Sequence, residues 1–182
     1  MPLKRIMVIR HGEKPSMDGT VLGVTLAGVS NPDELSVRGW QRAGALVRFF
    51  APADGQEHAG IGRPESLFAQ RQTDHVTSVR APHTLGPLAD FIGKPISTQF
   101  AKDEEELLAA ALSAEAATVL VAWEHKAICL LANFIVGDNQ HTPQSWADDR
   151  FDIVWVFDSN GAGWSFSQVP QLLLPGDRSD PI

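Results

Sequence analysis

Two predicted strands, residues 3–9 and 118–123, constrain the fold of this chain more than any other feature, because each contains a continuous apolar run, residues 6–9 in the first and 119–123 in the second. Runs without polar alternation are typical of parallel strands that are buried on both faces of a sheet. Parallel neighbours need long crossover connections, which are usually helices, and a helical pattern follows each run. The sequence therefore predicts an α/β fold, a three-layer α/β/α sandwich with a mostly parallel central sheet.

Local signals predict the other elements. Helices are expected over 36–50, 81–92, 103–112 and 126–136, and short strands over 66–69 and 96–100. A final hairpin is expected from strands 153–157 and 164–169 about the turn 159–163. Ser36 is the predicted N-cap of the first helix, with Val37 and Trp40 on its packed face and Arg42 away from it. Asp103 is the predicted cap of the third helix, with Glu106 completing a capping box.

Length and composition limit the class of protein. A chain of 182 residues is long enough for one domain, which we expect to span residues 1–182. Its formal net charge of −7 argues against a general nucleic-acid binder, which needs a basic face. The longest apolar stretch, 127–136, is too short to span a bilayer. A cytoplasmic protein without membrane or nucleic-acid partners is the expectation, and its oligomeric state is left open.

Charged residues and histidines follow the ends of the predicted strands. Arg10, His11 and Gly12 come directly after the first apolar run, and His125 comes just after the second. The short strand 66–69 opens a polar loop that carries Arg80 to the start of a helix. Open α/β sheets bind ligands beyond the carboxyl ends of their strands. If these strands are neighbours, two arginines and two histidines meet in one crevice.

This set of side chains is suited to phosphoryl transfer. Arg10 and Arg80 can clamp phosphoryl oxygens with charge-assisted hydrogen bonds, and they would also keep His11 neutral and nucleophilic. His125 can donate a further hydrogen bond to the transferring group. Gly12 removes a side chain where phosphate and backbone must approach each other. No residues have the spacing of a metal site. Phosphoryl transfer through a histidine needs neither a metal nor an organic cofactor, so none is expected.

Three motifs in order resemble the histidine phosphatase superfamily, which is phosphoglycerate mutase-like. They are "IRHGEK", "SVRAPHT" and "LVAWEHKAI", and "ELSVRGWQRA" resembles the helix that follows the first of them. The resemblance runs from residue 3 to about 135. It implies a phosphoglycerate mutase-like fold and hydrolysis of phosphomonoesters, with His11 as the nucleophile that becomes phosphohistidine. It also implies that Arg10, Arg80 and His125 complete the phosphate pocket.

The resemblance leaves the proton donor open. The family's general acid follows either the second histidine, where this chain has Lys126, or the second arginine at some distance. The second pattern favours Glu104, with Glu105 and Glu13 as alternatives. The substrate would be a phosphorylated small molecule or a phosphoprotein, selected by residues 13–35. A phosphomutase and a non-catalytic phosphate-binding regulatory domain are the alternative functions.

Overall fold

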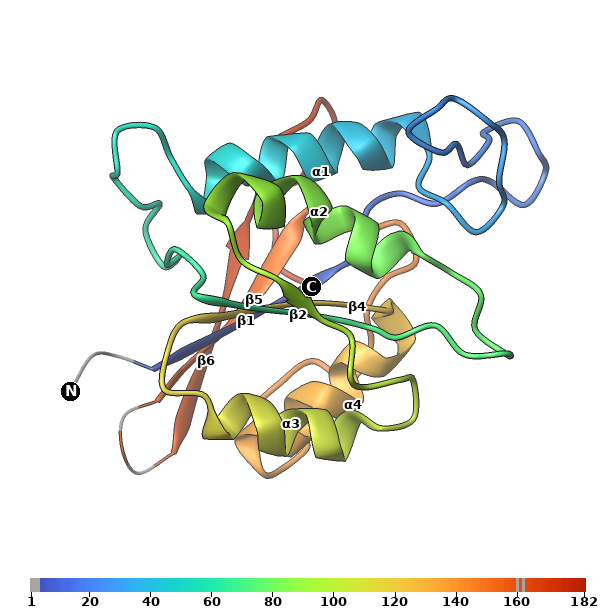
Figure 1. The fold of residues 1–182 in the computed structure, drawn as a ribbon. Helices are drawn as coiled ribbons and strands as arrows, with labels where there is room; N and C mark the ends of the chain where they lie inside the picture. The colour runs from blue at the N-terminus through green and yellow to red at the C-terminus, as the bar shows by residue number, and fades with distance from the viewer. Residues whose placement is uncertain (1–3, 160, 162) are drawn as a thin grey trace.

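A computed structural model describes residues 4–159, 161 and 163–182, and one six-stranded sheet runs through it (Figure 1). The strand order is β3-β2-β4-β1-β5-β6. The pairs β1–β4, β4–β2 and β2–β3 are parallel, whereas β5 runs antiparallel to both β1 and β6. The strands are β1 (Arg5–Arg10), β2 (Ser66–Ala69), β3 (Ile96–Ser97), β4 (Val119–Trp123), β5 (Ile153–Ser159) and β6 (Trp164–Pro170).

Two pairs of helices cover the two faces of this sheet (Figure 1). Helices α1 (Val37–Phe50) and α2 (Arg80–Ile92) lie on one face, over an apolar cluster that includes Met7, Ile9 and Leu120. Helices α3 (Glu105–Ala114) and α4 (His125–Val136) lie on the other, over a cluster that includes Val8 and Val121. The predicted three-layer α/β/α sandwich with a mostly parallel sheet is therefore confirmed.

One of the two predicted N-caps is confirmed. The Ser36 hydroxyl accepts a hydrogen bond from the N–H of Gly39, and Gly137 ends α4 in the left-handed conformation. At the start of α3 the prediction was wrong. Asp103 has φ of 72°, Glu104 is the N-cap residue, and Glu104 makes no side-chain cap bond within the helix.

The packed face of α1 also differs from the prediction. Val37 is exposed, whereas Arg42 is buried with 1% of its surface exposed. Arg42 is tolerated there because its guanidinium bonds Glu13 at 2.8 Å and Asp177 at 2.7 Å, so the buried charge is paired. Hydrophobic spacing alone does not reveal such a pair, because the two partners are distant in sequence.

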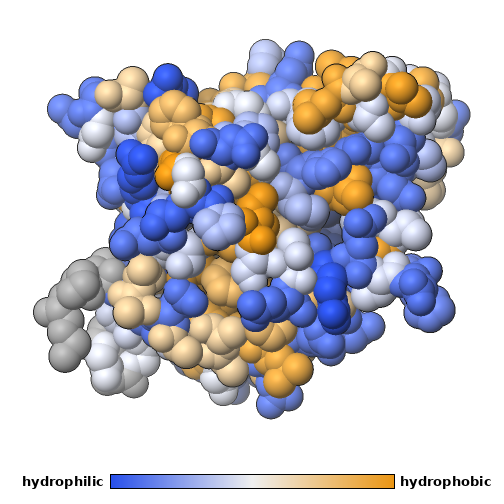
Figure 2. All heavy atoms as spheres, in the orientation of Figure 1, coloured by the Kyte–Doolittle hydropathy of each residue, from blue (hydrophilic) through white to orange (hydrophobic). Residues whose placement is uncertain are grey.

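Residues 13–35 form a long loop without regular helix or strand beyond isolated bridges. Figure 2 shows apolar side chains gathered at the upper right, over this loop. Its exposed apolar residues are Met17, Val21, Leu22, Leu26 and Val29. Of the predicted hairpin turn, Asn160 and Ala162 lie outside the described residues, as does Leu3 of the predicted first strand. No helix among the described residues has the length and apolarity needed to cross a membrane.

Candidate active site

Four of the predicted site residues lie at the carboxyl ends of β1 and β4, namely Arg10, His11, Gly12 and His125. Arg10 pairs with Trp123 in the sheet, and the N–H of His11 donates to the carbonyl of Trp123 at 3.1 Å. Helix α4 begins at His125 and helix α2 begins at Arg80. Both helix N-termini therefore carry a site residue, and a helix N-terminus favours a bound anion.

The site residues come from both faces of the sheet. Alternate residues of a strand point to opposite faces. Met7 and Ile9 pack under α1 and α2, whereas Ile6 and Val8 pack against α3 and α4. Continuing this alternation, Arg10 belongs to the α3/α4 face and His11 to the α1/α2 face. An anion held by both residues would lie across the edge of the sheet.

The imidazole of His11 is buried and uncharged. Its Nδ1 lies 2.8 Å from the carbonyl oxygen of Gly12, which can only accept, so Nδ1 carries the proton and Nε2 keeps its lone pair. Burial, together with the charges of Arg10, Arg80 and His125, lowers the pKa of His11 to about 3. A neutral imidazole whose Nε2 keeps its lone pair is therefore present in the folded protein across the neutral pH range.

Arg10 presents unused donors at the same place. Its Nη1 bonds the carbonyls of Asp148 at 2.7 Å and Arg150 at 3.1 Å, and the guanidinium lies 3.8 Å from the ring centre of Phe151. Nε and Nη2 are buried and have no hydrogen-bond partner in the part of the chain that the structure describes. Burial lowers the pKa of Arg10 to about 10, so the group remains a cation at neutral pH.

Arg80 and His11 line one pocket of about 210 Å³. Nη1 of Arg80 donates to the carbonyl of Pro32 at 3.0 Å, while its buried Nε has no partner among the described residues. Burial lowers the pKa of Arg80. The other residues that line this pocket are Asp33, Gln70, His75, Val76, Thr77, Ser78, Ala81 and Glu124.

The second histidine is held by an acidic partner. Nε2 of His125 lies 2.5 Å from Oδ1 of Asp148, whose side chain is 86% exposed. The buried Nδ1 has no partner within the described chain. Burial and the charge of Arg10 lower the pKa of His125, and the bond to Asp148 opposes them. The carboxylate therefore accepts the Nε2 proton, and the free ring nitrogen is Nδ1.

Gly12 is required mainly by the packing of the first motif against α1. A Cβ at this position would meet the carbonyl oxygen of Gly39 at 3.0 Å and Cδ2 of Leu35 at 3.2 Å. The N–H of Gly12 donates to the hydroxyl of Thr84 at 2.7 Å. A direct role of Gly12 toward phosphate remains a prediction, because its backbone donor already has a partner.

The three carboxylates considered as proton donors have structural partners. Glu104 accepts from the N–H of Ala101 at 2.8 Å, and it does not line the pocket of His11. Glu105 is buried and accepts from Nε1 of Trp123 at 3.0 Å. Glu13 is paired with two arginines of α1. The structure thus brings Arg10, Arg80 and His125 close enough for their charges to act on His11, and it leaves Glu104 outside the pocket that His11 and Arg80 line.

Three contributors were not assigned from the sequence. Asp148 orients His125, Phe151 lies against Arg10, and Thr84 joins the first motif to α2. Thr84 follows Arg80 by one helical turn, and that spacing is the only local signal for any of them. Asp148 and Phe151 lie in an irregular segment after α4, where no periodicity indicates their positions.

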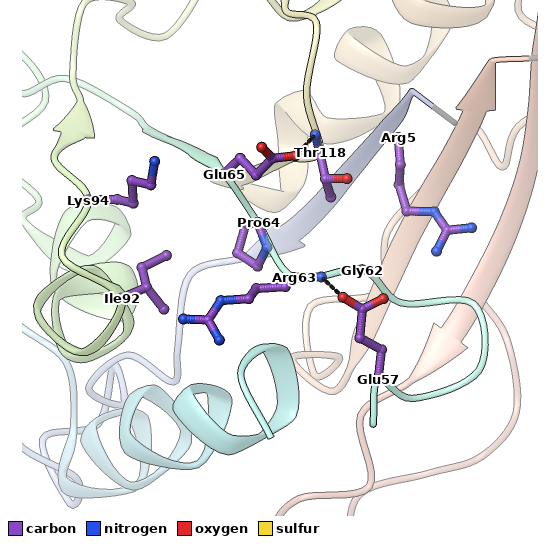
Figure 3. A pocket seen from close by; sticks show the side chains of 9 residues that line it. All are labelled: Arg5, Glu57, Gly62, Arg63, Pro64, Glu65, Ile92, Lys94 and Thr118. Atoms are coloured by element: carbon purple, nitrogen blue, oxygen red, sulfur yellow. Dashed lines mark hydrogen bonds between the residues drawn. The ribbon is translucent and has the colours of Figure 1, made fainter. Parts of the chain in front are cut away.

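A larger groove lies at the opposite end of the sheet and holds none of the predicted site residues (Figure 3). It measures about 520 Å³ and includes Arg5, the first residue of β1, together with the exposed side chains of Arg63 and Lys94. Among the described residues, no group of three or more histidine, cysteine, aspartate or glutamate side chains is placed to hold a metal ion.

The sandwich and the strand order correspond to the phosphoglycerate mutase-like fold. A phosphoserine phosphatase from Entamoeba histolytica, solved with 3-phosphoglyceric acid, matches with a TM-score of 0.57 at 13% identity, covering 90% of this chain and 94% of that one. A mycobacterial glucosyl-3-phosphoglycerate phosphatase, solved with VO3, matches with a TM-score of 0.56 at 12% identity, covering 91% and 97%. No protein-family model matches the sequence, and no curated protein matches it either.

Proposed function

We propose that the chain is a histidine phosphatase that hydrolyses phosphomonoesters through a phosphohistidine on His11. The observation that supports this most is the set of unused donors around a neutral imidazole. Buried guanidinium N–H groups without partners cost free energy, which an anion bound between them would recover. Arg10 and Arg80 supply such groups beside the unprotonated Nε2 of His11. The fold shared with two phosphatases agrees with this proposal.

The reaction proceeds in two displacements. Nε2 of His11 attacks phosphorus, the ester P–O bond breaks, and the leaving oxygen takes a proton from an acid. Arg10, Arg80 and the N-termini of α2 and α4 stabilise the negative charge on the transferring oxygens. Water then attacks phosphorus, the P–N bond breaks, and inorganic phosphate is released. His125 contributes a hydrogen bond to the phosphoryl group when its ring is protonated.

Hydrolysis of p-nitrophenyl phosphate tests the proposal. Wild type should turn over, and brief incubation with labelled substrate should give an acid-labile, base-stable phosphoprotein. His11→Ala should lose both properties while it retains the thermal stability of a folded protein. Lys94→Ala is the matched control, since it removes a cation from the groove at the opposite end of the sheet.

Vanadate should inhibit wild type strongly, because it adopts the five-coordinate shape of the transition state. Label retained in His11→Ala would assign the nucleophile to another residue. Tight binding of phosphate without turnover of any ester would leave a phosphate-binding domain instead of an enzyme. Transfer of the phosphoryl group to a second alcohol, in preference to water, would indicate a phosphomutase.

A further inference from the structure

We propose that Glu124 is the proton donor of this site. The inference rests on the proposed phosphatase function, and it assigns a catalytic role that neither spacing nor resemblance to the family assigns. Glu124 follows β4 directly and precedes His125. It lines the same pocket as His11 and Arg80.

The sheet places Glu124 beside the nucleophile. Arg10 and Trp123 are register partners in parallel strands, so the next residues along the two strands are His11 and Glu124. Glu124 retains extended backbone angles, with φ of −80° and ψ of 138°. Leu120 and Ala122 pack on the α1/α2 face, and alternation continues that face to Glu124. His11 and Glu124 therefore face the same side of the sheet.

The other carboxylates near the site interact with other charged residues. Asp148 is engaged with His125, and Glu13 is paired with arginines of α1. Asp33 shares the pocket, but its charge acts on Arg80, where burial lowers the pKa of the guanidinium and Asp33 opposes that lowering. Glu124 is the pocket carboxylate that comes from the same strand end as the second histidine.

The Glu124 carboxyl group has one buried oxygen and a cation nearby. Its Oε1 is buried, and Nζ of Lys102 lies 3.4 Å away. A phosphate dianion that arrives beside the carboxylate favours its protonated form, because like charges then no longer share the site. After the proton has been donated, Lys102 offsets the charge of the carboxylate that is formed. Lys102 is thus a positioning residue.

The proposed step is balanced in protons and electrons. As the Nε2–P bond forms, the ester P–O bond breaks and its electron pair stays on the leaving oxygen. The carboxyl proton of Glu124 moves to that oxygen, and the leaving group departs as a neutral alcohol. In the second displacement the Glu124 carboxylate accepts a proton from the attacking water, which restores the acid.

Leaving groups of different basicity provide the test. p-Nitrophenolate leaves without protonation, whereas an alkoxide does not. Glu124→Gln should therefore slow an alkyl phosphate by roughly 10²–10⁴-fold, the usual range for general acid catalysis, and p-nitrophenyl phosphate far less. Lys102→Met should also slow hydrolysis of the alkyl phosphate more than hydrolysis of p-nitrophenyl phosphate. Glu106→Gln, on the exposed side of α3, is the matched control and should change neither.

Asp33→Asn and Glu104→Gln complete the set. If either one shows the leaving-group dependence while Glu124→Gln slows both substrates equally, the inference is overturned and the phosphatase assignment stands. If wild type does not hydrolyse p-nitrophenyl phosphate, both the role of Glu124 and the phosphatase assignment are overturned. Should Glu124→Gln unfold, a selective loss on alkyl phosphates in folded Lys102→Met would support the inference, and its absence would overturn it.

Discussion

The backbone N–H of Gly12 donates to the hydroxyl of Thr84 across 2.7 Å. The same hydroxyl donates to the carbonyl of Arg80, also at 2.7 Å. One buried side chain thus holds the loop of His11 and Gly12 at a fixed distance from α2, the helix that begins at Arg80. Thr84 touches no reacting atom and is a positioning residue.

Thr84→Val should therefore weaken both stability and catalysis. The change keeps the shape of the side chain but leaves the Gly12 N–H buried without a partner, which typically costs about 1–3 kcal/mol. We expect a lower urea midpoint and a fall in kcat/KM for p-nitrophenyl phosphate. Thr84→Ser, which keeps the hydroxyl, should restore most of both. Equal activity in the valine and serine variants would contradict this role.

Alanine substitutions at Gly12 and Gly44 should have opposite effects on stability, one through packing and the other through helix propensity. Gly12→Ala should destabilise by about 1–3 kcal/mol, because the new Cβ would meet the backbone of Gly39. Gly44→Ala, within α1, meets nothing within 4 Å and should stabilise by about 0.5–1 kcal/mol through helix propensity. Chemical denaturation of both variants measures the contrast. A neutral Gly12→Ala would show that the first motif can move away from α1.

The buried His11 makes stability depend on pH. Its pKa is about 3 in the folded protein and about 6.5 in an unfolded chain, so the unfolded state binds more protons between those values. The free energy of unfolding should therefore fall as pH falls through this window, by at most about 1.4 kcal/mol per pH unit from this group. His11→Asn should flatten the dependence, and the exposed His141→Asn should not. Urea denaturation at several pH values measures it.

Anion binding should be coupled to protonation of His125. Its lowered pKa keeps the ring neutral in the empty site, with its proton shared with Asp148. A dianion near Nδ1 favours the imidazolium, which can then donate from both nitrogens. Sulfate titrations near pH 7, in buffers of different ionisation enthalpy, should show proton uptake in wild type. They should show little uptake in His125→Gln. Buffer-independent heats in wild type would contradict the prediction.

The sequence predicted the layers and the main site residues because these follow from short-range patterns. The apolar runs of β1 and β4 and the residues at their ends are continuous in sequence, and parallel pairing brings the two ends together. The prediction was weaker where a long-range partner decides. In the sequence, Arg42 has the pattern of a surface residue of α1. In the structure it is buried because Asp177, in the C-terminal segment, forms an ion pair with it.

Which carboxylate reaches the pocket of His11 was the hardest part of the site to predict, for a related reason. Glu104 and Glu105 lie in an acidic run at a helix start, where glutamates serve the helix dipole and the backbone. Glu105 in fact bonds Trp123, and Glu104 bonds the N–H of Ala101. Which glutamate reaches a pocket depends on strand register and on the face to which it points. Spacing from Arg80 contains neither kind of information.

The division of the site between two faces has a consequence for how the protein acquires activity. Arg10 belongs to the face that α3 and α4 cover, and Arg80 begins a helix of the opposite layer. A partly folded chain with only one helical layer docked would hold half of the anion's ligands and would be inactive. During refolding, the recovery of turnover should therefore follow the slower of the two layers, so that activity reports completion of the whole sandwich.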